Sequence, residues 1–101
     1  MQSVIHGVLQ EEKERNVAMQ AAHEQEIASL RRGNIKEKSR GGHLYYYLQY
    51  RQGDKIIDEY IGKDDESVRK VREETEKRKY LQGVLKRLRQ EYKEICRIVK
   101  D

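Results

Sequence analysis

Tyrosine and basic side chains are concentrated between residues 31 and 60 of this 101-residue chain. All seven aromatic residues of the chain are tyrosines, and residues 31–55 carry seven Lys or Arg against two acidic residues, a local charge of +5. A tyrosine ring can stack on an unpaired base, and a Lys or Arg side chain binds phosphate. This segment could therefore recognise a nucleic acid, provided that the backbone brings the rings and the cations to one surface.

A sheet is the element that can bring them together. Residues 43–51 and 55–61 are rich in strand-forming side chains and flank the turn signal Gln52-Gly53-Asp54. A second turn signal, Gly41-Gly42, joins residues 34–40 to them as a further strand. We expect a three-stranded antiparallel meander within residues 33–63, with two-residue turns at Gly41-Gly42 and Gly53-Asp54.

Two-residue turns fix the register, and alternation along each strand then assigns side chains to the two faces. Arg40 lies opposite His43, Lys38 opposite Tyr45, and Arg51 opposite Ile56; Lys36 and Tyr60 both lie opposite Tyr47. The face expected to pack on the helices collects Ile35, Leu44, Tyr46, Leu48, Tyr50, Ile57 and Ile61. The opposite face, hereafter the outer face, also holds His43, Gln49, Ile56 and Asp58, and its expected nucleic-acid-binding residues are Lys36, Lys38, Arg40, Tyr45, Tyr47, Arg51 and Tyr60. A one-residue slip at the second turn would instead move Ile56 and Tyr60 to the core.

Helix-forming residues precede and follow the sheet. Residues 1–32 contain no proline and predict one helix, with Arg31 and Arg32 in its last turn. Residues 64–101 predict a long second helix that begins at Asp64 or Asp65 and continues through Gly83. The apolar positions of the first helix are Ile5, Val8, Leu9, Ala18, Met19, Ala22, Ile27 and Leu30.

The second helix carries an apolar stripe at heptad spacing, hereafter the apolar seam, made of Leu81, Leu85, Leu88, Tyr92, Ile95 and Val99. Extended backwards, the same spacing meets Arg78, Glu74 and Val71. The favoured interpretation is that the first helix packs antiparallel on this seam, and the alternative is a homodimer through Leu81–Val99. The expected fold is α+β, with residues 1–101 forming a single domain of helix, meander and helix.

Composition excludes several classes of protein. Charged residues make up 40% of the chain and hydrophobic residues 36%, so the core must be thin. The chain contains no recognisable nucleophile-and-base arrangement and no glycine-rich phosphate loop, so we expect no catalytic residues and no enzyme. The three histidines lie far apart without a cysteine pair, so neither a metal nor another cofactor is expected. A single cysteine, Cys96, and no apolar run of about 18 residues favour a cytoplasmic location without a membrane partner.

Several short motifs resemble a family of small uncharacterised bacterial and archaeal proteins, many of them associated with mobile elements, in which a Tyr-rich hairpin lies between two helices. The motifs are Gly33-Asn34-Ile35, the run from Tyr45 to Arg51, then Gly53, Lys55 and Tyr60-Ile61-Gly62-Lys63. The hairpin is similar to the start of some transposases, and the order of three strands and a helix is similar to the arm-type DNA-binding domain of phage integrases. Some members carry a cysteine cluster where this chain has residues 38–42, so the resemblance implies no metal here.

These features lead to two ranked hypotheses of function. The first is a small nucleic-acid-binding module of a phage or mobile element, with DNA or RNA as the partner of the outer face. The second is an inhibitor or adaptor that binds a protein, such as nuclease or recombinase machinery, in the manner of an anti-CRISPR inhibitor of a host defence nuclease. A purely structural coiled-coil module ranks third.

Overall fold

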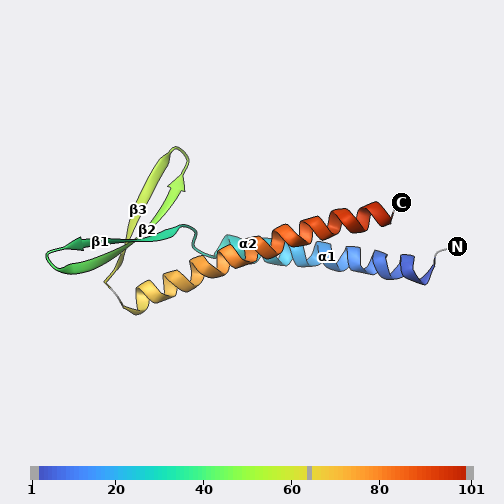
Figure 1. Ribbon diagram of the computed structural model, residues 1–101, viewed down its shortest axis with the longest axis horizontal. Helices are drawn as coiled ribbons and strands as arrows, with labels where there is room; N and C mark the ends of the chain where they lie inside the picture. The colour runs from blue at the N-terminus through green and yellow to red at the C-terminus, as the bar shows by residue number, and fades with distance from the viewer. Residues whose placement is uncertain (1–2, 64, 100–101) are drawn as a thin grey trace. The chain divides into compact units, whose positions relative to one another are not determined.

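The computed structural model describes residues 3–63 and 65–99. One helix precedes a three-stranded sheet along the chain and a second helix follows it (Figure 1). The elements are α1 (Val4–Ser29), β1 (Asn34–Arg40), β2 (His43–Gln52), β3 (Lys55–Gly62) and α2 (Glu66–Ile98). The α+β fold expected from the sequence is therefore confirmed. The chain forms two compact units, a helical unit of Met1–Ser29 with Tyr80–Asp101 and a sheet unit of Leu30–Lys79. Helix α2 contributes its first half to the sheet unit and its second half to the helical unit.

The sheet has the expected order β1-β2-β3, and both hairpins are antiparallel. The expected pairs are observed across both turns, including Arg40 with His43 and Arg51 with Ile56, so the second turn has not slipped. Gly41 and Gly42 have φ values of +56° and +80°, the left-handed conformation that a two-residue hairpin turn of this kind requires. The glycines therefore set the register on which the composition of the outer face depends.

One irregularity lies near the end of β3. Tyr47 pairs with Tyr60 but Tyr46 pairs with Gly62, so Ile61 has no partner across the strands and lies half-buried in a bulge. The expectation that Leu44 belongs to the core is wrong, since its side chain is 47% exposed. Leu44 lies beside the Gly41-Gly42 turn, at the far end of the hairpin, where the strand has passed the buried part of the sheet.

The core of the sheet unit combines the middle of β2 with the first half of α2. Tyr46 and Leu48 are buried from the sheet, and Val68, Val71 and Thr75 are buried from the helix. The buried stripe of α2 therefore runs back through Thr75 and not, as the spacing predicted, through the half-buried Glu74. Two hydrogen bonds join this helix to the start of the sheet unit: Arg78 Nη1 donates to the Leu30 carbonyl (2.9 Å), and Lys79 Nζ donates to Oδ1 of Asn34, the first residue of β1 (2.7 Å).

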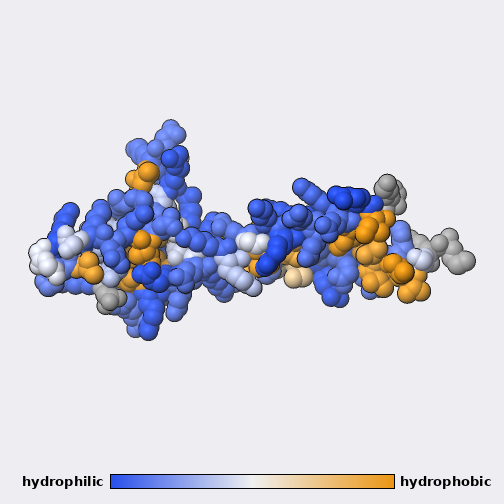
Figure 2. Space-filling model, viewed as in Figure 1, coloured by the Kyte–Doolittle hydropathy of each residue, from blue (hydrophilic) through white to orange (hydrophobic). Residues whose placement is uncertain are grey.

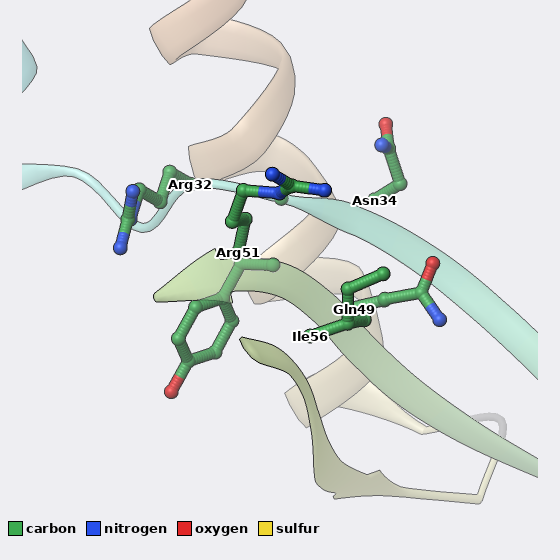
Figure 3. Close-up of a pocket in the computed structure, with 7 residues that line it drawn as sticks. Arg32, Asn34, Gln49, Arg51 and Ile56 are labelled. Atoms are coloured by element: carbon green, nitrogen blue, oxygen red, sulfur yellow. The ribbon is translucent and has the colours of Figure 1, made fainter. Parts of the chain in front are cut away.

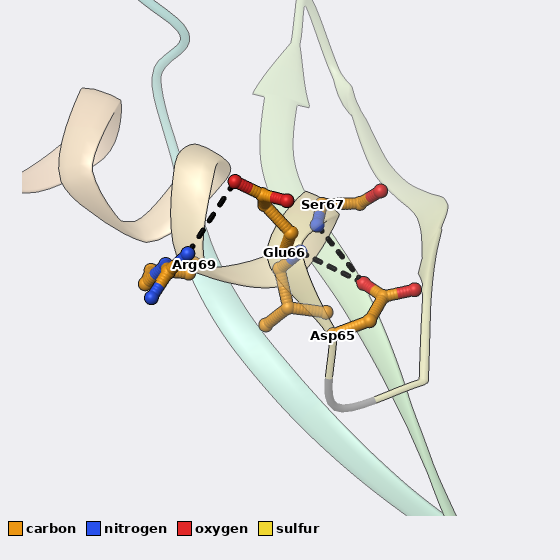
Figure 4. A network of polar contacts seen from close by, with 5 residues as sticks. Asp65, Glu66, Ser67 and Arg69 are labelled. Carbon is orange, nitrogen blue, oxygen red and sulfur yellow. Dashed lines mark hydrogen bonds and ion pairs between the residues drawn. The ribbon is translucent and has the colours of Figure 1, made fainter.

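A short polar side chain lies at the start of α2, and another lies at the end of α1. Asp65 caps α2, because its Oδ1 accepts hydrogen bonds from the backbone N–H groups of Ser67 (3.0 Å) and Val68 (3.3 Å) (Figure 4). The other cap candidate, Asp64, lies outside the described residues. Helix α1 stops at Ser29, whose hydroxyl donates to the Glu26 carbonyl (2.7 Å). The placement of Arg31 and Arg32 in its last turn is therefore wrong, since both follow the helix.

In the helical unit, α1 packs antiparallel on the second half of α2. Leu81, Leu85, Leu88 and Val99 of the apolar seam are buried, whereas Tyr92 and Ile95 are half-buried. Asn16 Nδ2 donates to the Leu88 carbonyl (2.9 Å), and Arg89 pairs with Glu24 (3.3 Å). The seam is thus covered within one chain, as the favoured interpretation predicted.

The buried face of α1 differs from the expected one. Ile5, Val8 and Met19 are 72%, 52% and 40% exposed, and the expected positions Ala18 and Ala22 are exposed as well. Of the expected positions, Ile27 is buried, and Leu9 and, just after the helix, Leu30 are half-buried. The helix also buries Asn16, which lies on the same stripe at heptad spacing. Asn16 tolerates this position because its Nδ2 donates to the Leu88 carbonyl and its Oδ1 accepts from Gln20 Nε2 (2.7 Å).

Candidate nucleic-acid interface

The observed register brings the seven expected binding side chains to the outer face. On β1 and β3, alternate residues point to this side, and on β2 the odd-numbered residues from Tyr45 to Arg51 do so. The residues that the register gathers here are Lys36, Lys38, Arg40, Tyr45, Tyr47, Arg51 and Tyr60. The four cations of this set share the outer face with one carboxylate, Asp58. Lys63 Nζ also lies 5.7 Å from the centre of the Tyr45 ring, so the local charge is five minus one, or +4.

Three tyrosines form a cluster at one end of the outer face. The ring of Tyr60 lies 5.4 Å from that of Tyr47 in an edge-to-face arrangement and 6.4 Å from that of Tyr45. Together with Arg40 they line an open hollow of about 340 Å³, hereafter the tyrosine hollow. Tyr60 is 54% exposed, so its ring can meet a planar ligand without any change in the fold.

The cations of the outer face differ in how free they are. Lys38 Nζ lies 4.5 Å from the centre of the Tyr47 ring and 3.6 Å from Asp58 Oδ2, so its charge is already shared. Within the described part of the chain, Lys36, Arg40 and Arg51 form no ion pair. These three side chains are therefore the ones most available for phosphate.

A second hollow surrounds Arg51 at the other end of the strands, hereafter the arginine hollow (Figure 3). It has a volume of about 260 Å³, and its labelled side chains in the figure are those of Arg32, Asn34, Gln49, Arg51 and Ile56. The guanidinium groups of Arg32 and Arg51 and the amide of Asn34 supply hydrogen-bond donors suited to an anion, whereas Gln49 Nε2 already donates to Asp58 Oδ1 (3.0 Å). From the sequence, Arg32 is expected on the helix and is therefore missed as a site residue, and Asn34 is expected on the first strand without a binding role.

Gly33 explains how Arg32 reaches this site. Its φ is +124°, and a Cβ added there would lie 2.5 Å from the carbonyl oxygen of Gln49. Only glycine lets the backbone pass this close to β2, and the chain then leaves α1 with Arg32 beside the sheet. A glycine just after the expected helix end is the sequence signal that could have indicated this turn toward the sheet.

A different basic surface lies on α2 in the helical unit. It is a groove of about 380 Å³ lined by Lys86, Arg89, Gln90, Lys93, Glu94 and Arg97, and no aromatic ring contributes to it. Arg89 is paired with Glu24, and Glu94 adds a negative charge. This groove offers cations without stacking surfaces, which makes it a suitable control for the outer face.

The described residues contain no group of three His, Cys, Asp or Glu side chains that could hold a metal ion together. Among them, no helix is apolar over the length needed to cross a membrane.

Fold and site together define a small α+β protein with a basic, tyrosine-rich sheet face. The chain belongs to the family described as a domain of unknown function (DUF6788), whose model matches residues 9–70 and so covers α1 from Leu9, the sheet and the start of α2. Neither a curated protein nor a solved structure matches the chain. The similarity to transposases and to phage integrases stays a prediction.

Proposed function

We propose that the protein is a non-catalytic module that binds single-stranded DNA or RNA through its outer face, in a phage or mobile-element context. The observation that carries this proposal is the tyrosine hollow beside cations that form no ion pair, Arg40 foremost. Exposed rings offer stacking surfaces to unpaired bases, and neighbouring cations attract the phosphates that join them.

The tyrosine hollow and the arginine hollow are spaced so that one single-stranded nucleic acid running along the sheet could contact both. Tyr47 and Arg51 are four residues apart on β2, a separation of about 13 Å at the usual rise of a strand. A strand of a few nucleotides can therefore stack a base in the tyrosine hollow while a phosphate meets Arg51. A duplex keeps its bases stacked and paired, so it can use the cations but not the rings.

The direct test is fluorescence anisotropy with a labelled oligonucleotide of about 12 residues, single-stranded or in a duplex, at low and moderate salt. We expect the single strand to bind more tightly and its affinity to fall as salt rises, because bound cations release counterions. Arg40→Ala and Arg51→Ala should each flatten the salt dependence by about one phosphate contact, whereas Lys93→Ala on α2 should not. Absence of binding at low salt, or equal effects of all three variants, would refute the proposal.

A protein partner is the second candidate for the same surface. It is favoured by the ion pair between Lys38 and Asp58, which reduces the positive charge at the centre of the outer face. Mixed charges around exposed tyrosines are typical of protein interfaces. The anisotropy test separates the two candidates, because a protein-binding face has no reason to prefer single strands over duplexes.

A further inference from the structure

Helix α1 carries a second stripe at heptad spacing, which the fold leaves uncovered. Its members follow one another at spacings of three and four residues and are hereafter called the free stripe, namely Ile5, Val8, Glu12, Arg15, Met19 and Ala22. The helix packs on α2 through the other stripe, which includes Asn16 and Ile27. Within residues 3–63 and 65–99, α1 therefore has two heptad faces and packs on another helix through one of them.

The free stripe is apolar at both ends and exposed along its length. Ile5 is 72% exposed and Val8 52% exposed, and Met19 is 40% exposed farther along the helix. Figure 2 shows apolar surface gathered at the end of the helical unit where α1 begins. Apolar side chains at heptad spacing on a helix surface indicate a helical partner.

We propose that the free stripe is a homodimer interface, in which α1 packs antiparallel on α1 of a second copy. A two-fold symmetric contact requires that, if residue i meets residue j, then j also meets i. Antiparallel pairing about the midpoint between Glu12 and Arg15 meets this condition with complementary chemistry throughout. Ile5 meets Ala22, Val8 meets Met19 and Glu12 meets Arg15, and each pair occurs twice.

The charges in the middle of the free stripe select this arrangement over the others. Parallel pairing in register would place Glu12 against Glu12 and Arg15 against Arg15, which repel each other. Shifting the antiparallel pairing by one heptad toward the start of the helix places Val8 against Glu12 and Ile5 against Arg15, so apolar side chains meet charged ones. A shift the other way places Arg15 against Met19. Glu12 and Arg15 are 47% and 69% exposed at the side chain and form only a 3.4 Å pair within their own helix, so both can reach a neighbour.

Self-complementarity is also what favours a second copy over a different protein. A stripe adapted to another partner would need to complement that partner's sequence and would have no reason to match its own reverse. The free stripe matches its reverse at all six positions, acid to base and apolar to apolar. This proposal does not depend on nucleic-acid binding, because the free stripe lies in the helical unit and the outer face in the sheet unit.

Charge exchange tests the interface by analytical ultracentrifugation over a range of protein concentrations. We expect the wild type to dimerise and Arg15→Glu to weaken dimerisation about tenfold or more, because Glu12 then faces an acid in both symmetric pairs. The double variant Glu12→Arg with Arg15→Glu should restore the dimer. Val17→Glu, at a 50% exposed valine on the same helix outside the free stripe, should leave it unchanged. A wild type that stays monomeric, or a double variant no better than Arg15→Glu, would overturn the proposal.

Cross-linking tests the register itself, in a background where Cys96 is replaced by serine. Mixing Val8→Cys with Met19→Cys should give a disulfide-linked heterodimer under mild oxidation, because these residues face each other. Val8→Cys alone should not cross-link, since the two copies of residue 8 lie eleven residues apart along the helices, about 16 Å, beyond disulfide reach. Efficient cross-linking of Val8→Cys alone would indicate parallel pairing and contradict the register.

Discussion

At the scale of single residues, Asp58 is the side chain that most limits the outer face. Its carboxylate accepts a hydrogen bond from Gln49 Nε2 (3.0 Å) and forms an ion pair with Lys38 Nζ at 3.6 Å. Asp58 therefore repels phosphate and also partly neutralises the charge of Lys38. Asp58→Asn removes the charge and leaves an oxygen that can still accept from Gln49. We expect tighter binding of single-stranded oligonucleotides and a steeper salt dependence in anisotropy titrations. Unchanged or weaker binding would mean that Lys38 and Asp58 lie outside the interface.

Tyr60 is the residue at which stacking can be measured most cleanly. It is 54% exposed, so its removal should not alter the fold. Tyr60→Ala should cost about 1 to 3 kcal/mol of binding free energy, the usual contribution of a base stacked on an aromatic ring. Tyr60→Phe keeps the ring and should bind like the wild type. If the phenylalanine variant were as weak as the alanine variant, the hydroxyl and not the ring face would be the recognised group.

At the scale of elements, Gly33 and Gly83 differ in whether the structure leaves room for a side chain, so substitutions at the two positions can be compared. Gly33 has a φ of +124°, and an added Cβ would meet the Gln49 carbonyl oxygen at 2.5 Å, whereas a Cβ at Gly83 would meet nothing within 4 Å. Gly33→Ala should therefore lower the free energy of unfolding by more than about 1 kcal/mol. Gly83→Ala, inside α2, should raise it by about 0.5 to 1 kcal/mol. Urea unfolding measures both changes, and equal effects would contradict the close approach of Gly33 to β2.

The apolar seam of α2 should contribute strongly to the stability of the helical unit. Leu88 is 7% exposed, and its backbone carbonyl accepts the hydrogen bond from Asn16. Leu88→Ala should lower the free energy of unfolding by about 2 to 5 kcal/mol, because it leaves a cavity between the two helices. Gln90→Ala, on the exposed side of the same turn, is the control and should change stability little. If Leu88→Ala and Gln90→Ala had the same melting temperature, Leu88 would be exposed to solvent and the seam would not be buried.

The register of the sheet could be predicted from the sequence, although the bulge at Ile61 and the exposure of Leu44 could not. For α1 the helix itself could be predicted, but its buried face could be predicted only in part. Two-residue turns at Gly41-Gly42 and Gly53-Asp54 leave one register, and alternation then determines which side chains share the outer face. Helix α1 instead carries two stripes at the same heptad spacing, and periodicity cannot decide which one packs inward. Burial of Asn16 depends on an accepting carbonyl at Leu88, 72 residues along the chain, which no local pattern reveals.

The candidate site was predictable in part for the same reason. Strand alternation found the tyrosine cluster and the cations of β1, but the arginine hollow depends on a loop. Arg32 belongs to it only because α1 ends at Ser29 and Gly33 turns the chain against β2. Loop positions of this kind are set by tertiary contacts and not by periodicity.

At the scale of the whole molecule, the two proposed surfaces should be separable by mutation. Arg15→Glu alters the free stripe in the helical unit and leaves the outer face intact. We expect this variant to bind a short oligonucleotide, with room for a single protein, as the wild type does. On an oligonucleotide several times longer, the variant should bind more weakly than the wild type, because the wild-type dimer gains avidity from its two outer faces. If the variant and the wild type bound the long oligonucleotide with the same affinity, dimerisation and nucleic-acid binding would not be linked.

Two-dimensional NMR of the 12.1 kDa protein tests residue by residue whether the outer face is the nucleic-acid interface. A single-stranded oligonucleotide added at low salt should shift backbone and tyrosine ring signals of β1, β2 and β3, most strongly around Tyr47, Tyr60 and Arg51. Signals of Lys86 and Lys93 on α2 should move little. Shifts confined to α2, or no shifts at saturating oligonucleotide, would contradict nucleic-acid binding by the outer face.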